Sequence, residues 1–300
     1  MMFRISIFTL CFLLVLSSCE KDISIKLKPS TTDLVVDASI ENGNYPVVFL
    51  SRSFDYFNQI DPATLASSFV HDAEVTMSNG DITARLREDS LKNDSSNLMI
   101  YYYSFNRNDP DQHFLGELNH DYQLEIKYGG QTYAATTHIP LIRKRVDSLW
   151  WTPAPKSDDS NKVVVKARII DPPGFGDYTR YYTSVNYGSF YPGLQSVFDD
   201  QITDGTEYVV NVDKGVNRNL SINFDDYSFF MRGDTIQVKL ANIDKATYDF
   251  WRTMEYNYQS IGNPFSSPVH VLSNISNGAL GYFGGYAAEY SELVIPRKDR

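Results

Sequence analysis

The sequence is poor in cysteine, in positive charge and in long apolar runs, and each shortage argues against a class of protein. Only two of its 300 residues are cysteines. Cys11 lies in an apolar leader, so we expect neither a disulfide nor a cysteine-ligated metal in the mature chain. Asp and Glu number 37 against 27 Lys and Arg, a formal charge of −10, which disfavours a nucleic-acid partner. The apolar run at 5–16 is shorter than the roughly 20 residues of a membrane-spanning helix.

Motifs of common enzymes are also missing from the sequence. The five histidines include no His-Glu-x-x-His pair, and no Gly-x-Ser-x-Gly nucleophile elbow is present. We therefore predict that the chain is not an enzyme, has no catalytic residues and uses neither a cofactor nor a metal. Because a catalytic triad can assemble from distant positions, an envelope hydrolase acting on glycan or peptide stays open as an alternative, as does a surface adhesin.

The start of the chain has the order of a bacterial lipoprotein signal. Arg4 precedes the apolar run, and Leu16-Ser17-Ser18-Cys19 resembles the lipobox, in which small residues precede an acylated cysteine. The resemblance implies that residues 1–18 are a signal peptide and that lipid is attached at Cys19. Several acyl chains together form a stable membrane anchor. We expect residues 19–33 to be a lipid-anchored tether.

The residues that follow the lipobox suggest the side of the membrane on which the protein lies. Glu20-Lys21-Asp22 partially resembles the acidic signal that sends Bacteroidota-type lipoproteins to the outer face of the outer membrane. We therefore expect a lipid-anchored protein of the outer membrane, at the cell surface. An anchor that faces the periplasm stays open.

The body of the chain is predicted to be mostly β, in two β-sandwich-like domains. Residues 34–140 contain short alternating segments separated by turn signals, a pattern typical of an immunoglobulin-sized sandwich. Two hairpins are the clearest elements. The first turns at Asn79-Gly80, and the second turns at Gly129-Gly130, between alternating apolar residues on both sides.

The second predicted domain, 141–300, is β-rich with one helix near 244–260. The basic and Trp-rich stretch 143–155 reads as a domain junction, and 163–169, 209–212, 220–224 and 236–240 read as strands. Asp244 is a candidate helix cap. The apolar residues behind it recur at helical spacing and predict packing against a sheet; they are Phe250, Trp251, Met254 and Tyr258.

The C-terminal third carries a resemblance to a family. Its most specific part runs from Asn263-Pro264-Phe265 through 273–278 to Gly284-Gly285-Tyr286. With the lipobox, it resembles a domain-of-unknown-function family of Bacteroidota outer-membrane lipoproteins, typically encoded beside TonB-dependent receptors. The resemblance implies an accessory or ligand-capture role beside such a receptor in nutrient uptake. It supplies no catalytic residue.

Two aromatic groups are the candidate binding surface. Tyr and Phe on a Gly/Pro-rich segment provide a large contact area at low entropy cost, which suits a peptide or glycan ligand or a protein partner. For both groups the alternative is core packing. The first group would then face the core from a hairpin, and the second would form a final hairpin that closes the core of the second domain. The first group lies in an aromatic stretch from Phe175 to Phe198 that also contains Tyr181. The candidates are Tyr187, Phe190, Tyr191, Tyr282, Phe283 and Tyr286.

Overall fold

The structure is a computed structural model that describes residues 33–54, 62–93, 98–106, 114–261, 263, 266–267 and 269–298. The predicted signal peptide, Cys19 and most of the tether lie outside these residues. Among the described residues, neither helix has the length and apolarity needed to cross a membrane. The described residues belong to one compact unit, and the division into two domains near residue 140 stays a prediction.

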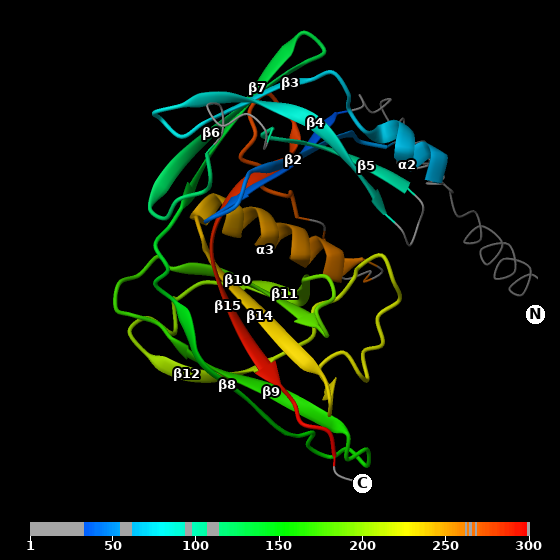
Figure 1. Cartoon of the computed structure of the whole chain (residues 1–300), viewed down its shortest axis with the longest axis vertical. Coiled ribbons are helices and arrows are strands. Elements are labelled where there is room, and N and C mark those ends of the chain that lie inside the picture. The colour runs from blue at the N-terminus through cyan, green and yellow to red at the C-terminus, as the bar shows by residue number, and fades with distance from the viewer. Residues whose placement is uncertain are drawn as a thin grey trace, which may run out of the picture. The chain divides into compact units, whose positions relative to one another are not determined.

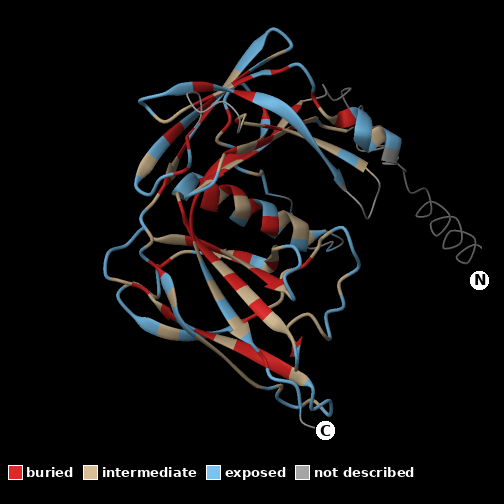
Figure 2. Ribbon diagram, in the orientation of Figure 1, coloured by how far each residue is buried: buried red, intermediate tan, exposed pale blue. Residues whose placement is uncertain are grey.

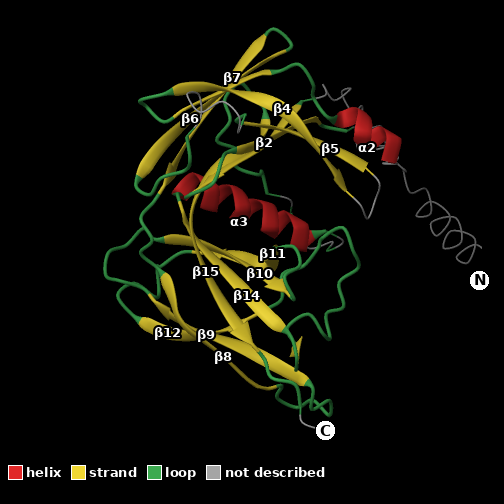
Figure 3. Cartoon of the chain, in the orientation of Figure 1, coloured by secondary structure: helices red, strands yellow, loops and turns green. Residues whose placement is uncertain are grey.

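The described chain is mostly β, as the sequence predicts, with two sheets (Figure 3). The larger sheet has eleven strands in the order β11-β10-β14-β15-β1-β2-β5-β4-β3-β6-β7. Its strands in chain order are β1 (Leu34–Glu41), β2 (Val47–Arg52), β3 (Glu74–Ser78), β4 (Thr83–Asn93), β5 (Leu98–Ser104), β6 (His120–Tyr128), β7 (Gln131–Ile139), β10 (Tyr178–Val185), β11 (Tyr191–Phe198), β14 (Thr235–Ile243) and β15 (Leu280–Val294).

The smaller sheet is built around β9 (Lys162–Ile170). One edge of β9 pairs with β8 (Arg145–Pro153), and the other edge pairs with β12 (Glu207–Val212) and the short β13 (Phe230–Met231). The helices are α2 (Pro62–Ser68) and α3 (Lys245–Ser260). Figure 1 shows α3 crossing strands of the larger sheet.

Strand β15 joins segments from opposite ends of the chain. It pairs parallel with β1 on one edge and antiparallel with β14 on the other. Gly281 lies where β15 meets β1, at φ +100°, and a Cβ there would lie 1.8 Å from the Val36 carbonyl oxygen. Only glycine fits such an approach at this backbone angle. The parallel pairing therefore depends on this one residue.

Successive side chains of β15 point to opposite faces and enter different cores. Residues 282–288 are all buried, and Figure 2 shows this part of the strand in red. Phe283 and Ala287 join the core formed by β1–β7. Tyr282 and Tyr286 join a second core beneath α3. A third core lies between β9 and β14 and includes Ile295, just past the end of β15. One segment thus contributes to every hydrophobic cluster among the described residues.

Both predicted hairpins are confirmed. β3 pairs with β4 across the turn at Asn79-Gly80, and β6 pairs with β7 across Gly129-Gly130. Gly129 and Gly130 have φ of +60° and +75°, angles that favour glycine. The alternation is also as expected, because Tyr122, Leu124 and Ile126 are buried while their neighbours face solvent.

Helix α3 begins where the sequence predicts. Asp244 caps it, with its Oδ1 accepting a hydrogen bond from the Thr247 backbone N–H at 2.8 Å. Phe250 is buried and stacks on Tyr282 at 4.5 Å between ring centroids. Met254, at the edge of the predicted stripe, is 38% exposed. The helix packs on β15, β11 and β10, so the predicted contact with a sheet is confirmed.

Two expectations about single elements are wrong. Residues 220–224 are turns and loop rather than a strand. The C-terminal aromatic run forms one continuous strand, β15, rather than a hairpin. Its partner β1 lies more than 240 residues earlier, beyond the reach of local patterns.

Asp244 also ties α3 to the opposite part of the larger sheet. Its Oδ2 accepts hydrogen bonds from the Thr137 hydroxyl at 2.8 Å and the His138 backbone N–H at 3.1 Å. We predict that Asp244→Ala lowers the free energy of unfolding by about 2–3 kcal/mol, because a cap and two further hydrogen bonds are lost. Urea denaturation measures this.

The matched control is Asp249→Ala. Asp249 lies on the same helix in an exposed pair with Lys245, and such pairs contribute about 0.5 kcal/mol or less. Equal effects of the two substitutions would contradict the role assigned to Asp244.

Candidate functional site

An open cavity of about 940 Å³ lies between the two sheets. One wall is formed by β10, β11 and β14, and the facing wall by β8, β9 and β12. The strands at its margin, β11 and β12, are each at the end of their sheet. A concave, mostly apolar site of this volume has the size of a small-molecule pocket.

Alternation within each strand sends one set of side chains into the cavity. On β10, Thr179 and Tyr181 line it, while Arg180 and Tyr182 point to the face covered by α3. On β12, Val210 lines the cavity and Val209 does not. The apolar floor is formed by Ala167, Ile169, Val212, Val238 and Leu240.

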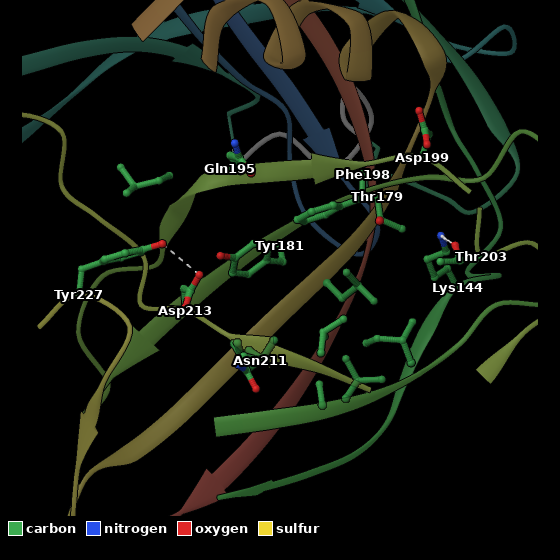
Figure 4. A pocket seen from close by; sticks show the side chains of 18 of the residues that line it. Lys144, Thr179, Tyr181, Gln195, Phe198, Asp199, Thr203, Asn211, Asp213 and Tyr227 are labelled. Atoms are coloured by element: carbon green, nitrogen blue, oxygen red, sulfur yellow. Dashed lines mark hydrogen bonds between the residues drawn. The ribbon is translucent and has the colours of Figure 1, made fainter. Parts of the chain in front are cut away.

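The polar groups are at the two ends of the cavity. Figure 4 shows Lys144 and Thr203 at one end, Asp213 and Tyr227 at the other, and Tyr181 between them. An apolar body with polar groups at its ends determines which molecules fit and in which orientation.

The Lys144 end is held by a buried ion pair. Lys144 Nζ lies 2.7 Å from Asp171 Oδ2, and both side chains are almost completely buried, at 1% and 0% exposed. Thr203 donates its hydroxyl to the same carboxylate oxygen at 2.7 Å. The amide of Asn242 fixes the backbone here, because it bonds both the N–H and the carbonyl of Lys144. The positive charge at this end is therefore neutralised within the protein.

Tyr248 holds the rim near this end. Its hydroxyl donates to Asp199 Oδ2 at 2.9 Å, and Asp199 lines the cavity. Burial and then this hydrogen bond raise the pKa of Tyr248 to about 12. The phenol therefore stays a donor at neutral pH, and the carboxylate is held in one orientation.

A charged network stiffens the wall behind the cavity. Glu255 of α3 accepts hydrogen bonds from the Ser196 backbone N–H at 2.9 Å and the Ser196 hydroxyl at 2.5 Å, and it lies 3.2 Å from Arg218. Arg180 donates to the Ser196 hydroxyl at 3.0 Å and stacks 3.4 Å over the Trp251 ring. The network joins β10, β11 and α3, so the wall is held in place from its far side.

The predicted binding residues do not line this cavity. Tyr282, Phe283 and Tyr286 are buried, at 5%, 0% and 4% exposed, so the prediction that they form a contact surface is wrong. Their rings fill the two cores that β15 separates. Phe283 belongs to the β1–β7 core, and the two tyrosines pack under α3.

The other predicted group lies at the surface near the β10–β11 turn. Tyr187 is 68% exposed with φ +60°, while Phe190 and Tyr191 are half-buried. Phe190 packs edge-on against Tyr290 at 5.6 Å between centroids. A binding role for this group stays a prediction.

Residues that sequence reasoning missed include Lys144, Asp213 and Tyr227. Tyr181 and Phe198 lie in the aromatic stretch that the sequence marks, and both line the cavity. Asp213 has no such local signal, since it is a single carboxylate after a short strand. Among the described residues, no three His, Cys, Asp or Glu side chains gather closely enough to hold a metal ion.

Comparison with protein families matches residues 20–291 to the family described as a domain of unknown function (DUF4249). The chain belongs to this family. No curated protein matches it. The matched range contains every residue that lines the cavity.

The buried pair at the Lys144 end gives a stability prediction. We predict that Lys144→Met lowers the free energy of unfolding by about 3–5 kcal/mol, because it leaves the buried Asp171 carboxylate without its cationic partner. Replacing both residues, as Lys144→Met with Asp171→Leu, should recover most of the loss. Urea denaturation of the variants tests this.

Lys162→Met is the control. Lys162 pairs with Asp226, but these side chains are 27% and 47% exposed, and we expect a loss of about 1 kcal/mol or less. If Lys144→Met were no more destabilising than Lys162→Met, the buried pair would not organise this end of the cavity.

Proposed function

We propose that this protein is an acylated outer-membrane lipoprotein of the Bacteroidota type that serves a TonB-dependent receptor as an accessory, ligand-capture partner in nutrient uptake, and that it is not an enzyme. The cavity between the sheets is the observation that carries the proposal. A capture protein needs an accessible apolar site with a few polar groups that orient the ligand. The receptor supplies the energy of transport, so this chain needs no cofactor.

The sequence before the described residues supports the anchor. Leu16-Ser17-Ser18-Cys19 offers the acylation site, and residues 19–33 precede the first strand. An extended segment of this length reaches at most roughly 50 Å. Such a tether would let the cavity approach a receptor in the same membrane while the protein remains anchored.

Removal of the anchor cysteine is the first test. We predict that Cys19→Ala moves the protein from the membrane fraction to the soluble fraction, because the acyl chains provide the stable attachment. Cys11→Ala is the matched control, since Cys11 lies in the predicted signal peptide and its loss should leave the protein in the membrane. Membrane retention of Cys19→Ala would contradict the anchor.

Affinity purification of the tagged protein tests whether it associates with a TonB-dependent receptor. We predict that the tagged protein, extracted from its own outer membrane in mild detergent, carries a TonB-dependent barrel in stoichiometric amount, identified by mass spectrometry. The control is an unrelated tagged lipoprotein from the same membrane, which should not carry the barrel. Recovery of the chain alone, while other membrane complexes stay intact, would contradict the proposed partnership.

A further inference from the structure

The end of the cavity at Asp213 is chemically different from the rest of its lining. The Tyr227 hydroxyl donates to Asp213 Oδ2 at 3.2 Å (Figure 4), and the structure gives no other hydrogen bond or ion pair to this carboxylate among the described residues. Burial, and then the charge of Asp213, raises the pKa of Tyr181, so the phenol faces the carboxylate in its protonated form.

The basic residues near the cavity do not neutralise Asp213. Of the described residues that line the cavity, Lys144 alone is basic, and it pairs with Asp171 at the far end. Lys214 follows Asp213 in the chain, but its ammonium lies over the Phe230 ring at 5.6 Å from the centroid and does not line the cavity. Arg218 is paired with Glu255. A negative charge thus faces the cavity without a cationic partner.

Two tyrosine side chains lie at the same end of the cavity as the Asp213 carboxylate. Tyr181 and Tyr227 line this end, and Phe198 lies further along the same wall. Aromatic faces attract ammonium groups, and the attraction grows where water is excluded. A lone carboxylate beside tyrosine rings therefore recognises a cationic nitrogen by two independent interactions, a charge-assisted hydrogen bond and a cation–π contact.

We propose that the cavity binds an amphipathic amine, with the ammonium at Asp213 and the apolar body along Ala167, Val212 and Leu240 between the sheets. The inference rests on the proposed function, since it names the class of ligand that the protein would capture. A fatty acid of equal size would place its carboxylate either at Asp213, where it is repelled, or at Lys144, whose charge Asp171 already neutralises. A neutral glycan lacks both the cation and the apolar body.

The experiment compares three probes of the same length: 4-phenylbutylamine, 4-phenylbutanol and 4-phenylbutanoate. Binding to the full chain is measured by isothermal titration calorimetry, with empty detergent micelles as the blank. We expect the amine to bind about tenfold to a hundredfold more tightly than the carboxylate, since a hydrogen bond to a charged group contributes about 1.5–3 kcal/mol. The alcohol should fall between them.

Asp213→Asn tests the charge while it keeps the shape of the side chain. We expect the preference for the amine over the carboxylate to disappear and the affinity for the alcohol to change less than threefold. Asp225→Asn is the control, because Asp225 lies on the same connection between β12 and β13 but does not line the cavity. This variant should prefer the amine over the carboxylate as strongly as the unmodified protein does.

Val210→Trp tests the location. The side chain of Val210 lines the cavity, so a tryptophan there should fill the space and abolish binding of all three probes. Val209→Trp is the matched control, because Val209 is the preceding residue on β12, is 52% exposed and does not line the cavity. Circular dichroism of both variants shows whether they are folded.

Three results would overturn the inference: a carboxylate that binds as tightly as the amine, an Asp213→Asn variant that keeps the preference, or a folded Val210→Trp variant that binds normally. These results are independent of the anchor and the receptor. If Cys19→Ala stays in the membrane or no barrel is recovered while the amine still binds at Asp213, the proposed function fails and the ligand class stands.

Discussion

The pairing of β15 with both β1 and β14 is the constraint on which the rest of the structure depends. It joins the first described strand to the last and makes one sheet of segments that lie far apart in sequence. Gly281 allows β15 to approach β1 closely enough to pair with it. Gly285 allows a close approach of β15 to β7, because a Cβ at this position would lie 2.6 Å from the His138 carbonyl oxygen. Without these contacts neither the β1–β7 core nor the core beneath α3 would be closed.

The cavity follows from the same arrangement. β15 pairs with β14, which contributes to one wall of the cavity. Glu255 of α3 holds Ser196 of β11 from behind, and Arg180 of β10 bonds the same serine. The smaller sheet forms the facing wall. β11 and β12 end their sheets at the margin, so the space between them is open to a ligand. The same topology therefore produces walls that are held in place and an open edge between β11 and β12. The proposed capture role needs the walls to shape the site and the open edge to admit a ligand.

Local patterns predicted the local elements of this fold. The hairpins at Gly80 and Gly129-Gly130, and the helix after Asp244, depend on residues close in sequence and were found. For β15 they predict either an exposed contact surface or a final hairpin, because its pairing and burial are decided by β1 and α3, which no window around it contains.

The site shows the same limit. Tyr181 and Phe198 stood out as part of an aromatic stretch, and they line the cavity. Lys144 lies in the basic stretch that the sequence predicts to be a domain junction, and nothing in that pattern indicates its burial against Asp171, 27 residues further along the chain. Asp213 becomes a candidate binding residue only when its surroundings in the cavity are known, since a single carboxylate after a strand is common in protein sequences.

The most direct test of the account is to locate a bound ligand between the sheets. Methyl-labelled protein titrated with 4-phenylbutylamine would show the site by NMR. The account predicts the largest shifts at Ile169, Val212 and Leu240, which line the cavity. Shifts confined to the second hollow, near Val47, Leu91 and Ile100 of β2, β4 and β5, would contradict it.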